Sequence, residues 1–149
     1  MDQDDLLGRI QTTARLHGRN ESRRVTATVL GVMRDLLPAS AYRRLTGPLP
    51  ADLRLPPPEP GRIVEIIDCR RFLTRVADRL YADDAAFLTR VVLAELNAGA
   101  RGTTPSDLAH LVPSDLRPLF RSRPEQPWQA LPAPSAQTFR RSGTEGPSS

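Results

Sequence analysis

The chain repeats part of itself at a fixed distance, and this repeat limits its fold more than any other feature of the sequence. The segment at 42–55 reads YRRLTGPLPADLRL, and the segment at 105–120 reads PSDLAHLVPSDLRPLF. An offset of 63 residues aligns identical residues in the two segments: Leu45 with Leu108, Pro50 with Pro113, Asp52 with Asp115, Leu53 with Leu116 and Arg54 with Arg117. An internal repeat constrains the architecture before other signals are considered. We therefore interpret the chain as a tandem duplication.

The repeat also extends into the residues before this motif. The offset of 63 aligns Thr26 with Thr89, Val29 with Val92, Leu30 with Leu93 and Met33 with Leu96. Further upstream an offset of 66 aligns Leu6 with Phe72, Leu7 with Leu73, Arg9 with Arg75 and Ile10 with Val76, and a loop of different length near residue 20 accounts for the change. Two copies are too few for an open solenoid. The sequence therefore predicts one closed bundle in which the two copies pack face to face.

Both copies carry the spacing of amphipathic helices, so we predict an all-α fold. Apolar residues recur on one helical face at Leu6, Ile10 and Ala14 in the first copy. The second copy shows the same spacing at Phe72 and Val76. The predicted organisation is a helical repeat at 1–55, a proline-rich connector at 56–62, a second helical repeat at 63–120 and a flexible tail at 121–149. The proline run is read as a stiff spacer, with a ligand for a proline-recognising module as the alternative.

Residues with capping side chains mark where helices should begin. We predict that Ser22 caps the second helix and that Asp68 caps the first helix of the second copy. Thr104 and Asp107 have nearly the spacing and chemistry of a capping box. The β-branched stretch IVEII at 63–67 fits either a short strand or a helix, and we expect it to be buried.

The residues that catalytic mechanisms need are scarce. All 21 basic residues are Arg, which fits a GC-rich bacterial coding background and leaves no Lys for a Schiff base or a phosphate-binding loop. His17 and His110 have no second metal ligand at helical spacing, and Asp83 with Asp84 are read as helix caps. The lone Cys69 is read as a small buried residue in a reducing compartment, with a reactive thiol as the alternative. We predict no enzyme, no metal and no cofactor.

The sequence also bears on where the protein resides. No apolar run approaches the roughly 20 residues of a membrane-spanning helix. The first ten residues, MDQDDLLGRI, are acidic and do not resemble a signal peptide. We therefore expect a cytoplasmic protein without membrane contact, and no sequence feature indicates its oligomeric state.

One polar motif appears in both copies. Its residues are Pro50, Asp52, Leu53 and Arg54 in the first copy and Pro113, Asp115, Leu116 and Arg117 in the second. We interpret the motif as structural: the leucine closes the end of the bundle, the aspartate caps its turn, and the arginine reaches a carboxylate or exposed carbonyl oxygens. The alternative is a paired binding surface.

Two sets of residues are candidates for binding a partner. The proline-rich tail contains Trp128, Leu131 and Phe139, which are the kind of apolar anchors with which a peptide docks in a groove of a partner protein; the alternative is a solvated tail without a role. The second set is arginine pairs that could contact a polyanion such as nucleic acid: Arg23, Arg24, Arg43, Arg44, Arg70 and Arg71. The net charge of +4 is dispersed along the chain and favours the protein partner. A small-ligand pocket between the repeats is a third alternative.

The second repeat resembles a bacterial family known only as domain of unknown function 2267. The resemblance rests on Phe72-Leu73, on the segment Arg90 to Leu93, on Leu111-Val112-Pro113, and on the residues from Leu116 to Phe120. It covers residues 63–120 well and residues 5–54 weakly, and it leaves out the tail. Pro105 and the proline-rich connector depart from the family pattern. The resemblance implies a small all-helical protein, often duplicated, and it implies no activity and no site residues.

Overall fold

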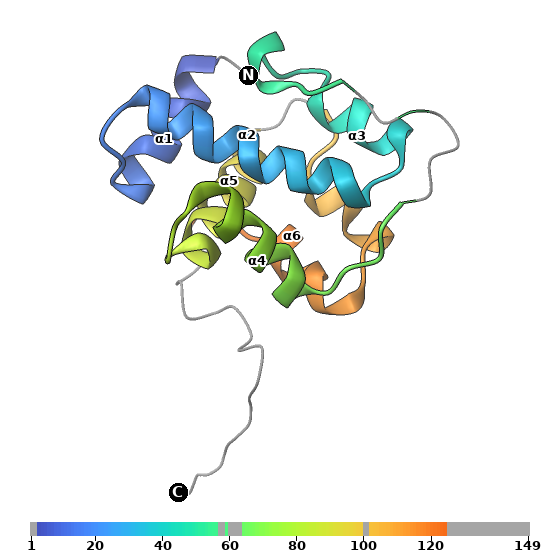
Figure 1. Cartoon of the computed structure of the whole chain (residues 1–149). Coiled ribbons are helices and arrows are strands. Elements are labelled where there is room, and N and C mark those ends of the chain that lie inside the picture. The colour runs from blue at the N-terminus through green and yellow to red at the C-terminus, as the bar shows by residue number, and fades with distance from the viewer. Residues whose placement is uncertain (1–2, 57–58, 60–63, 100–101, 125–149) are drawn as a thin grey trace, which may run out of the picture.

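Helices supply all the regular secondary structure in the described part of this computed structural model, which comprises residues 3–56, 59, 64–99 and 102–124 (Figure 1). The first half contains the helices α1 (Gln3–Ala14), α2 (Arg19–Leu36) and α3 (Ala39–Thr46), followed by the 3-10 turn η1 (Ala51–Leu53). The second half contains α4 (Cys69–Leu80), α5 (Ala85–Gly99), the 3-10 segments η2 (Ser106–Leu111) and η3 (Ser114–Leu116), and the short helix α6 (Arg117–Phe120). The prediction of an all-α fold is confirmed.

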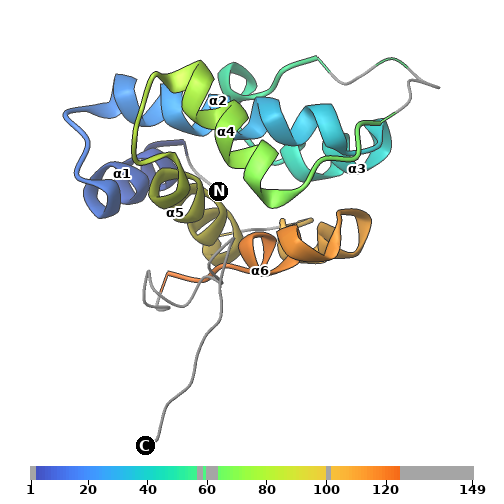
Figure 2. The same ribbon diagram turned by 60° about the horizontal axis from the view of Figure 1, so that its bottom comes forward.

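The longer helices pack across the two halves. Helix α1 contacts α2 and also α5, while α4 contacts α5 and also α2. Figure 2 shows α6 and the turns before it beneath the α2–α4 pair, and α5 contacts α6. The core is one continuous cluster, and the side chains of Tyr42, Phe72 and Phe120 are the largest that are fully buried in it. The rings of Phe72 and Phe120 meet edge to face with centroids 6.1 Å apart.

The order of elements is similar in the two halves: two longer helices, a short helical segment and a 3-10 turn. The third element differs, because α3 is an α-helix whereas η2 is a 3-10 segment. Arg9 and Arg75, which the alignment pairs, each reach an acidic residue on the second helix of the other half. Arg9 pairs with Glu95 on α5, and Arg75 pairs with Asp35 on α2. This arrangement is what a duplicated chain should show, and the duplication itself stays a prediction.

The predicted helix starts are partly right. Asp68 Oδ1 accepts the Arg71 N–H at 2.8 Å, as expected of a cap. Thr104 and Asp107 exchange two hydrogen bonds: the Thr104 N–H donates to Asp107 Oδ2 at 3.0 Å, and the Asp107 N–H donates to Thr104 Oγ1 at 3.1 Å. These two predictions succeed because the partners are three residues apart, so the local sequence determines the contact.

The prediction that Ser22 caps α2 is wrong. Helix α2 begins at Arg19, and Ser22 is fully buried inside it. The Ser22 hydroxyl donates to the carbonyl oxygen of Leu7 at 2.8 Å and so joins α2 to α1. The carboxylate of Glu21 accepts the N–H of His17 at 2.8 Å just before the helix. Tertiary packing of the serine thus outweighs its local preference for a helix start.

The expectation of a buried strand or helix at 63–67 is also wrong for the residues that the structure describes. Residues 64–67 have no regular structure, and Ile66 is 83% exposed. Ile67 alone of these four enters the core, at 3% exposure. The Glu65 N–H donates to the Asp35 carbonyl oxygen at 3.3 Å and holds this segment against the end of α2.

Candidate binding site

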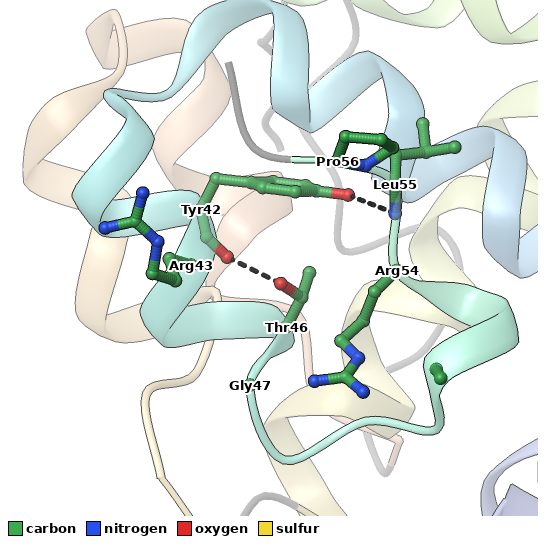
Figure 3. Close-up of a pocket in the computed structure, with 8 residues that line it drawn as sticks. Tyr42, Arg43, Thr46, Gly47, Arg54, Leu55 and Pro56 are labelled. Atoms are coloured by element: carbon green, nitrogen blue, oxygen red, sulfur yellow. Dashed lines mark hydrogen bonds between the residues drawn. The ribbon is translucent and has the colours of Figure 1, made fainter. Parts of the chain in front are cut away.

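An open pocket of about 450 Å³ lies where α3, the η1 turn and the residues after it meet (Figure 3). We call it the α3–η1 pocket. Its lining residues are Tyr42, Arg43, Thr46, Gly47, Ala51, Arg54, Leu55 and Pro56. All of them belong to the first half, so this pocket does not lie between the repeats.

The wall of the pocket is a short extended segment, residues 54–56, which we call the 54–56 strap. The hydroxyl of Tyr42 accepts the backbone N–H of Leu55 at 3.1 Å (Figure 3). On the other side the Arg34 guanidinium donates to the carbonyl oxygen of Pro56. The side chain of Leu55 packs over Gly31 of α2, where an added Cβ would lie 3.3 Å from Leu55 Cδ1. Three contacts from α2 and α3 therefore fix the strap.

The buried side of the pocket is built on Tyr42. Tyr42 is fully buried on α3, and the hydroxyl of Thr46 donates to its carbonyl oxygen at 2.9 Å. Burial raises the pKa of the Tyr42 hydroxyl, although the Leu55 N–H and the charge of Arg34 act in the opposite direction. The hydroxyl therefore stays neutral at pH 7. Leu53 is 1% exposed and anchors the η1 turn, which starts after Pro50.

The outer side of the pocket carries two guanidinium groups. Arg43 extends from α3 and Arg54 from the strap, and both side chains are exposed. In Figure 3 they lie on opposite sides of the last turn of α3, with Thr46 between them. An arginine presents several N–H donors in a planar fork that matches a carboxylate. The pocket thus combines an apolar wall with two separated positive groups.

The six arginines of the predicted polyanion set differ in their contacts and positions. Arg43 lines the pocket, and Arg44 is exposed beside it on α3. The Nε of Arg23 lies 2.9 Å from Asp52 Oδ2, and Arg24 Nη2 donates to the carbonyl oxygen of Leu80 at 3.0 Å. Arg70 and Arg71 are exposed at the start of α4. Two of the six are therefore engaged in contacts within the protein.

The residues of the repeated Asp-Leu-Arg motif make different contacts in the two halves. Leu53 and Leu116 are both buried, as the structural interpretation requires. The expectation that each aspartate caps its own turn is wrong, because neither η1 nor η3 has a capping side chain. Asp52 instead pairs with Arg23, and Asp115 accepts a hydrogen bond from α4. Both turns begin after a proline, Pro50 or Pro113, whose backbone is extended.

The two motif arginines also differ. Arg54 is exposed and lines the pocket, whereas Arg117 begins α6 and is partly buried. The Nε of Arg117 is a buried atom without a hydrogen-bond partner among the described residues. The two arginines therefore differ in exposure and in surroundings.

The other candidates among the described residues do not line the pocket. His17 and His110 are exposed, as are Asp83 and Asp84. The Cys69 thiol is half-buried; burial, followed by the charges of Asp115 and Asp68, raises its pKa to about 11. Among the described residues no three His, Cys, Asp or Glu side chains come close enough to hold a metal ion. Trp128, Leu131 and Phe139 lie outside the described residues.

Sequence reasoning missed the α3–η1 pocket. The signal that could have indicated it is the difference between the copies, because Tyr42 of the first copy stands where Pro105 stands in the second. Only the first copy therefore has a hydroxyl that can hold the strap after the repeated motif. Also, no helix within the described residues has the length and apolar character needed to traverse a bilayer.

The fold and the pocket define a small all-α protein with an arginine-bearing surface site. A family model described as an uncharacterized conserved protein (DUF2267) matches residues 3–119. The chain therefore belongs to the DUF2267 family, which confirms the resemblance found in its second repeat. No match was found among curated proteins or among solved structures.

Proposed function

We propose that this protein is a non-enzymatic helical module that acts in the cytoplasm by binding another protein. The α3–η1 pocket is the observation that supports this function. It is open to solvent, its wall is apolar and held in place, and arginines stand at its edge. Apolar centres surrounded by polar groups, with arginine enriched, are typical of protein–protein interfaces.

Two exposed apolar side chains, one of them in the pocket, add to this proposal. Leu55 is 43% exposed on the strap, and Ile66 is 83% exposed on the segment that leads into α4. The tail residues Trp128, Leu131 and Phe139 supply a second contact in the same proposal, as anchors for the partner. Scattered exposed apolar residues are common on proteins, so the pocket and not these residues carries the proposal.

Nucleic-acid binding is the second candidate. Arg43, Arg44, Arg70 and Arg71 are exposed, and the net charge is +4. Binding through arginine–phosphate contacts weakens steeply with salt because counterions are released. An affinity that stays constant between low and physiological salt would exclude it.

Site-specific photo-crosslinking in cells tests the proposal. A photo-reactive amino acid is placed at Ala51, which is exposed and lines the pocket, and at Asp78, which is exposed on α4 away from the pocket, as the matched control. We expect a nuclease-resistant protein adduct from position 51 and none from position 78. A shortened chain ending at residue 124 tests the tail: loss of the adduct shows that the tail contributes. Equal crosslinking from both positions, or adducts of nucleic acid only, would contradict the proposal.

A further inference from the structure

We infer that the α3–η1 pocket binds a short acidic peptide segment in which an apolar side chain lies between two carboxylates. This inference rests on the proposed function, because it names the partner feature that the pocket recognises. It follows from the separation of the two arginines, from the apolar residues of the strap beside them and from the hydrogen bonds that hold the strap.

The charges of the pocket require a negative ligand with more than one acidic group. Arg43 and Arg54 lie on opposite sides of the last turn of α3 and so present two positive positions instead of one (Figure 3). None of the described residues that line the pocket is acidic. An extended peptide advances about 3.3 Å per residue, so two acids a few residues apart can reach two separate guanidinium groups.

The apolar part of the pocket accepts the residue between these acids. Ala51, Leu55 and Pro56 line it and are exposed, and the fully buried Tyr42 supports them from beneath. The strap is already held by the Tyr42 hydroxyl and by Arg34 before any ligand arrives. A preformed wall avoids the entropy cost of ordering a loop on binding. An aliphatic side chain such as leucine therefore gains buried area without rearrangement of the pocket.

A peptide fits this pocket better than a nucleic acid does. Binding of single-stranded nucleic acid relies on exposed aromatic faces for base stacking. The aromatic ring of the pocket, Tyr42, is fully buried and its hydroxyl is engaged with Leu55. The chain's own tail at 125–149 has two Glu and two Arg and therefore lacks the net negative charge that Arg43 and Arg54 favour. An acidic segment of another protein is the occupant we propose.

The test is an NMR titration of the uniformly ¹⁵N-labelled full chain. The probe is the blocked tetrapeptide acetyl-Glu-Ala-Leu-Glu-amide, and its neutral counterpart with Gln at both acidic positions is the control ligand. We expect the acidic probe to shift backbone amides within residues 42–56, and we expect the neutral peptide to bind at least about tenfold more weakly, since it loses two ion pairs.

Matched variants locate the binding groups. Arg43→Gln and Arg54→Gln should each weaken the probe by about threefold to fivefold, as expected for an exposed ion pair. Arg44→Gln is the control, because Arg44 neighbours Arg43 on α3 but does not line the pocket. All three residues are exposed, so the fold should persist, and dispersed amide spectra of the variants verify this.

Four outcomes would overturn the inference. The first is equal binding of the acidic and neutral peptides, and the second is a set of shifts outside residues 42–56. The third is a gain of about threefold or more in probe affinity when the chain ends at residue 124, because the occupant is then the protein's own tail. Crosslinking at position 51 that persists in the Arg43→Gln, Arg54→Gln double variant would leave the proposed function intact and reject the acidic ligand. Binding of the probe without any cellular adduct would reject the proposed function and leave the acidic ligand intact.

Discussion

Asp115 caps a helix that begins 46 residues earlier in the chain, because its Oδ2 accepts the backbone N–H of Cys69 at 2.9 Å. Asp68 satisfies a second N–H of the same helix end, that of Arg71. Helix starts leave several N–H groups without partners, and carboxylates there are also favoured by the helix dipole. The turn η3 and the start of α4 are thus joined by a charged hydrogen bond.

Removal of this cap should destabilise the protein. We expect Asp115→Ala to lower the free energy of unfolding by about 1 kcal/mol, the usual cost of losing a helix cap. Asp52→Ala at the aligned position is the control, because Asp52 and Arg23 are both substantially exposed and such pairs contribute little. Urea denaturation followed by circular dichroism measures the free energy of unfolding of both variants. Equal losses in the two variants would show that the contact with Cys69 has no special role.

The thiol of Cys69 should remain protonated far above neutral pH. Burial and the nearby charges of Asp115 and Asp68 raise its pKa from 9.0 to about 11. The unfolded chain ionises its thiol first as pH rises, so the stabilising contribution of the protonated thiol is complete below about pH 9 and is lost as pH approaches 11. The rate of alkylation by iodoacetamide should rise with pH through that value. A midpoint near 9 in the folded protein would contradict the assignment, and Asp115→Asn should lower the midpoint.

The ion pair between Arg9 and Glu95 should matter more than the exposed pairs. Glu95 is buried, and its Oε1 lies 2.8 Å from Arg9 Nε on α1. Arg9→Met leaves a buried carboxylate without its partner, at a cost of about 1–3 kcal/mol. Adding Glu95→Gln should recover part of that loss, since the uncompensated charge is then gone. Strictly additive effects in chemical denaturation would show that the two side chains are not coupled.

The leucines of the repeated motif should be costly positions to truncate. Leu53 and Leu116 are 1% and 0% exposed, and Leu→Ala at such sites removes about 2–5 kcal/mol of stability. Leu111, which is 38% exposed on η2, is the matched control and should lose much less. Thermal and urea denaturation distinguish these cases. A small effect at either buried leucine would mean that its end of the bundle can collapse around the cavity.

The sequence predicts those features of this protein that depend on neighbouring residues. Helical spacing indicates the all-α fold, and caps such as Asp68 and the Thr104–Asp107 pair act over three residues. Ser22 has the same local preference, but its hydroxyl contacts Leu7 on another helix, and the local signal fails. Ile66 is apolar and still exposed, and the neighbouring Glu65 N–H is bonded to the Asp35 carbonyl oxygen at the end of α2, a contact that the linear sequence does not reveal.

The candidate site depends on contacts that a linear pattern does not reveal. The pocket exists because the Tyr42 hydroxyl meets the Leu55 N–H, thirteen residues later, after the chain has turned through η1. The predicted repeat aligns Arg54 with Arg117. Their surroundings differ, so one lies at a pocket and the other at the start of α6. Equivalence in sequence therefore did not extend to equivalence in chemistry.

The contacts between helices of different halves suggest that the protein can assemble from two separate fragments. Since α1 packs on α5 and α2 packs on α4, each half buries part of its apolar surface against the other. The connector then acts as a tether that raises the effective concentration of one half near the other. Two separately synthesised fragments, 1–55 and 63–149, should still find each other and reconstitute the bundle. At high concentration, two intact chains should be able to form a domain-swapped dimer, in which each half packs against the complementary half of the other chain.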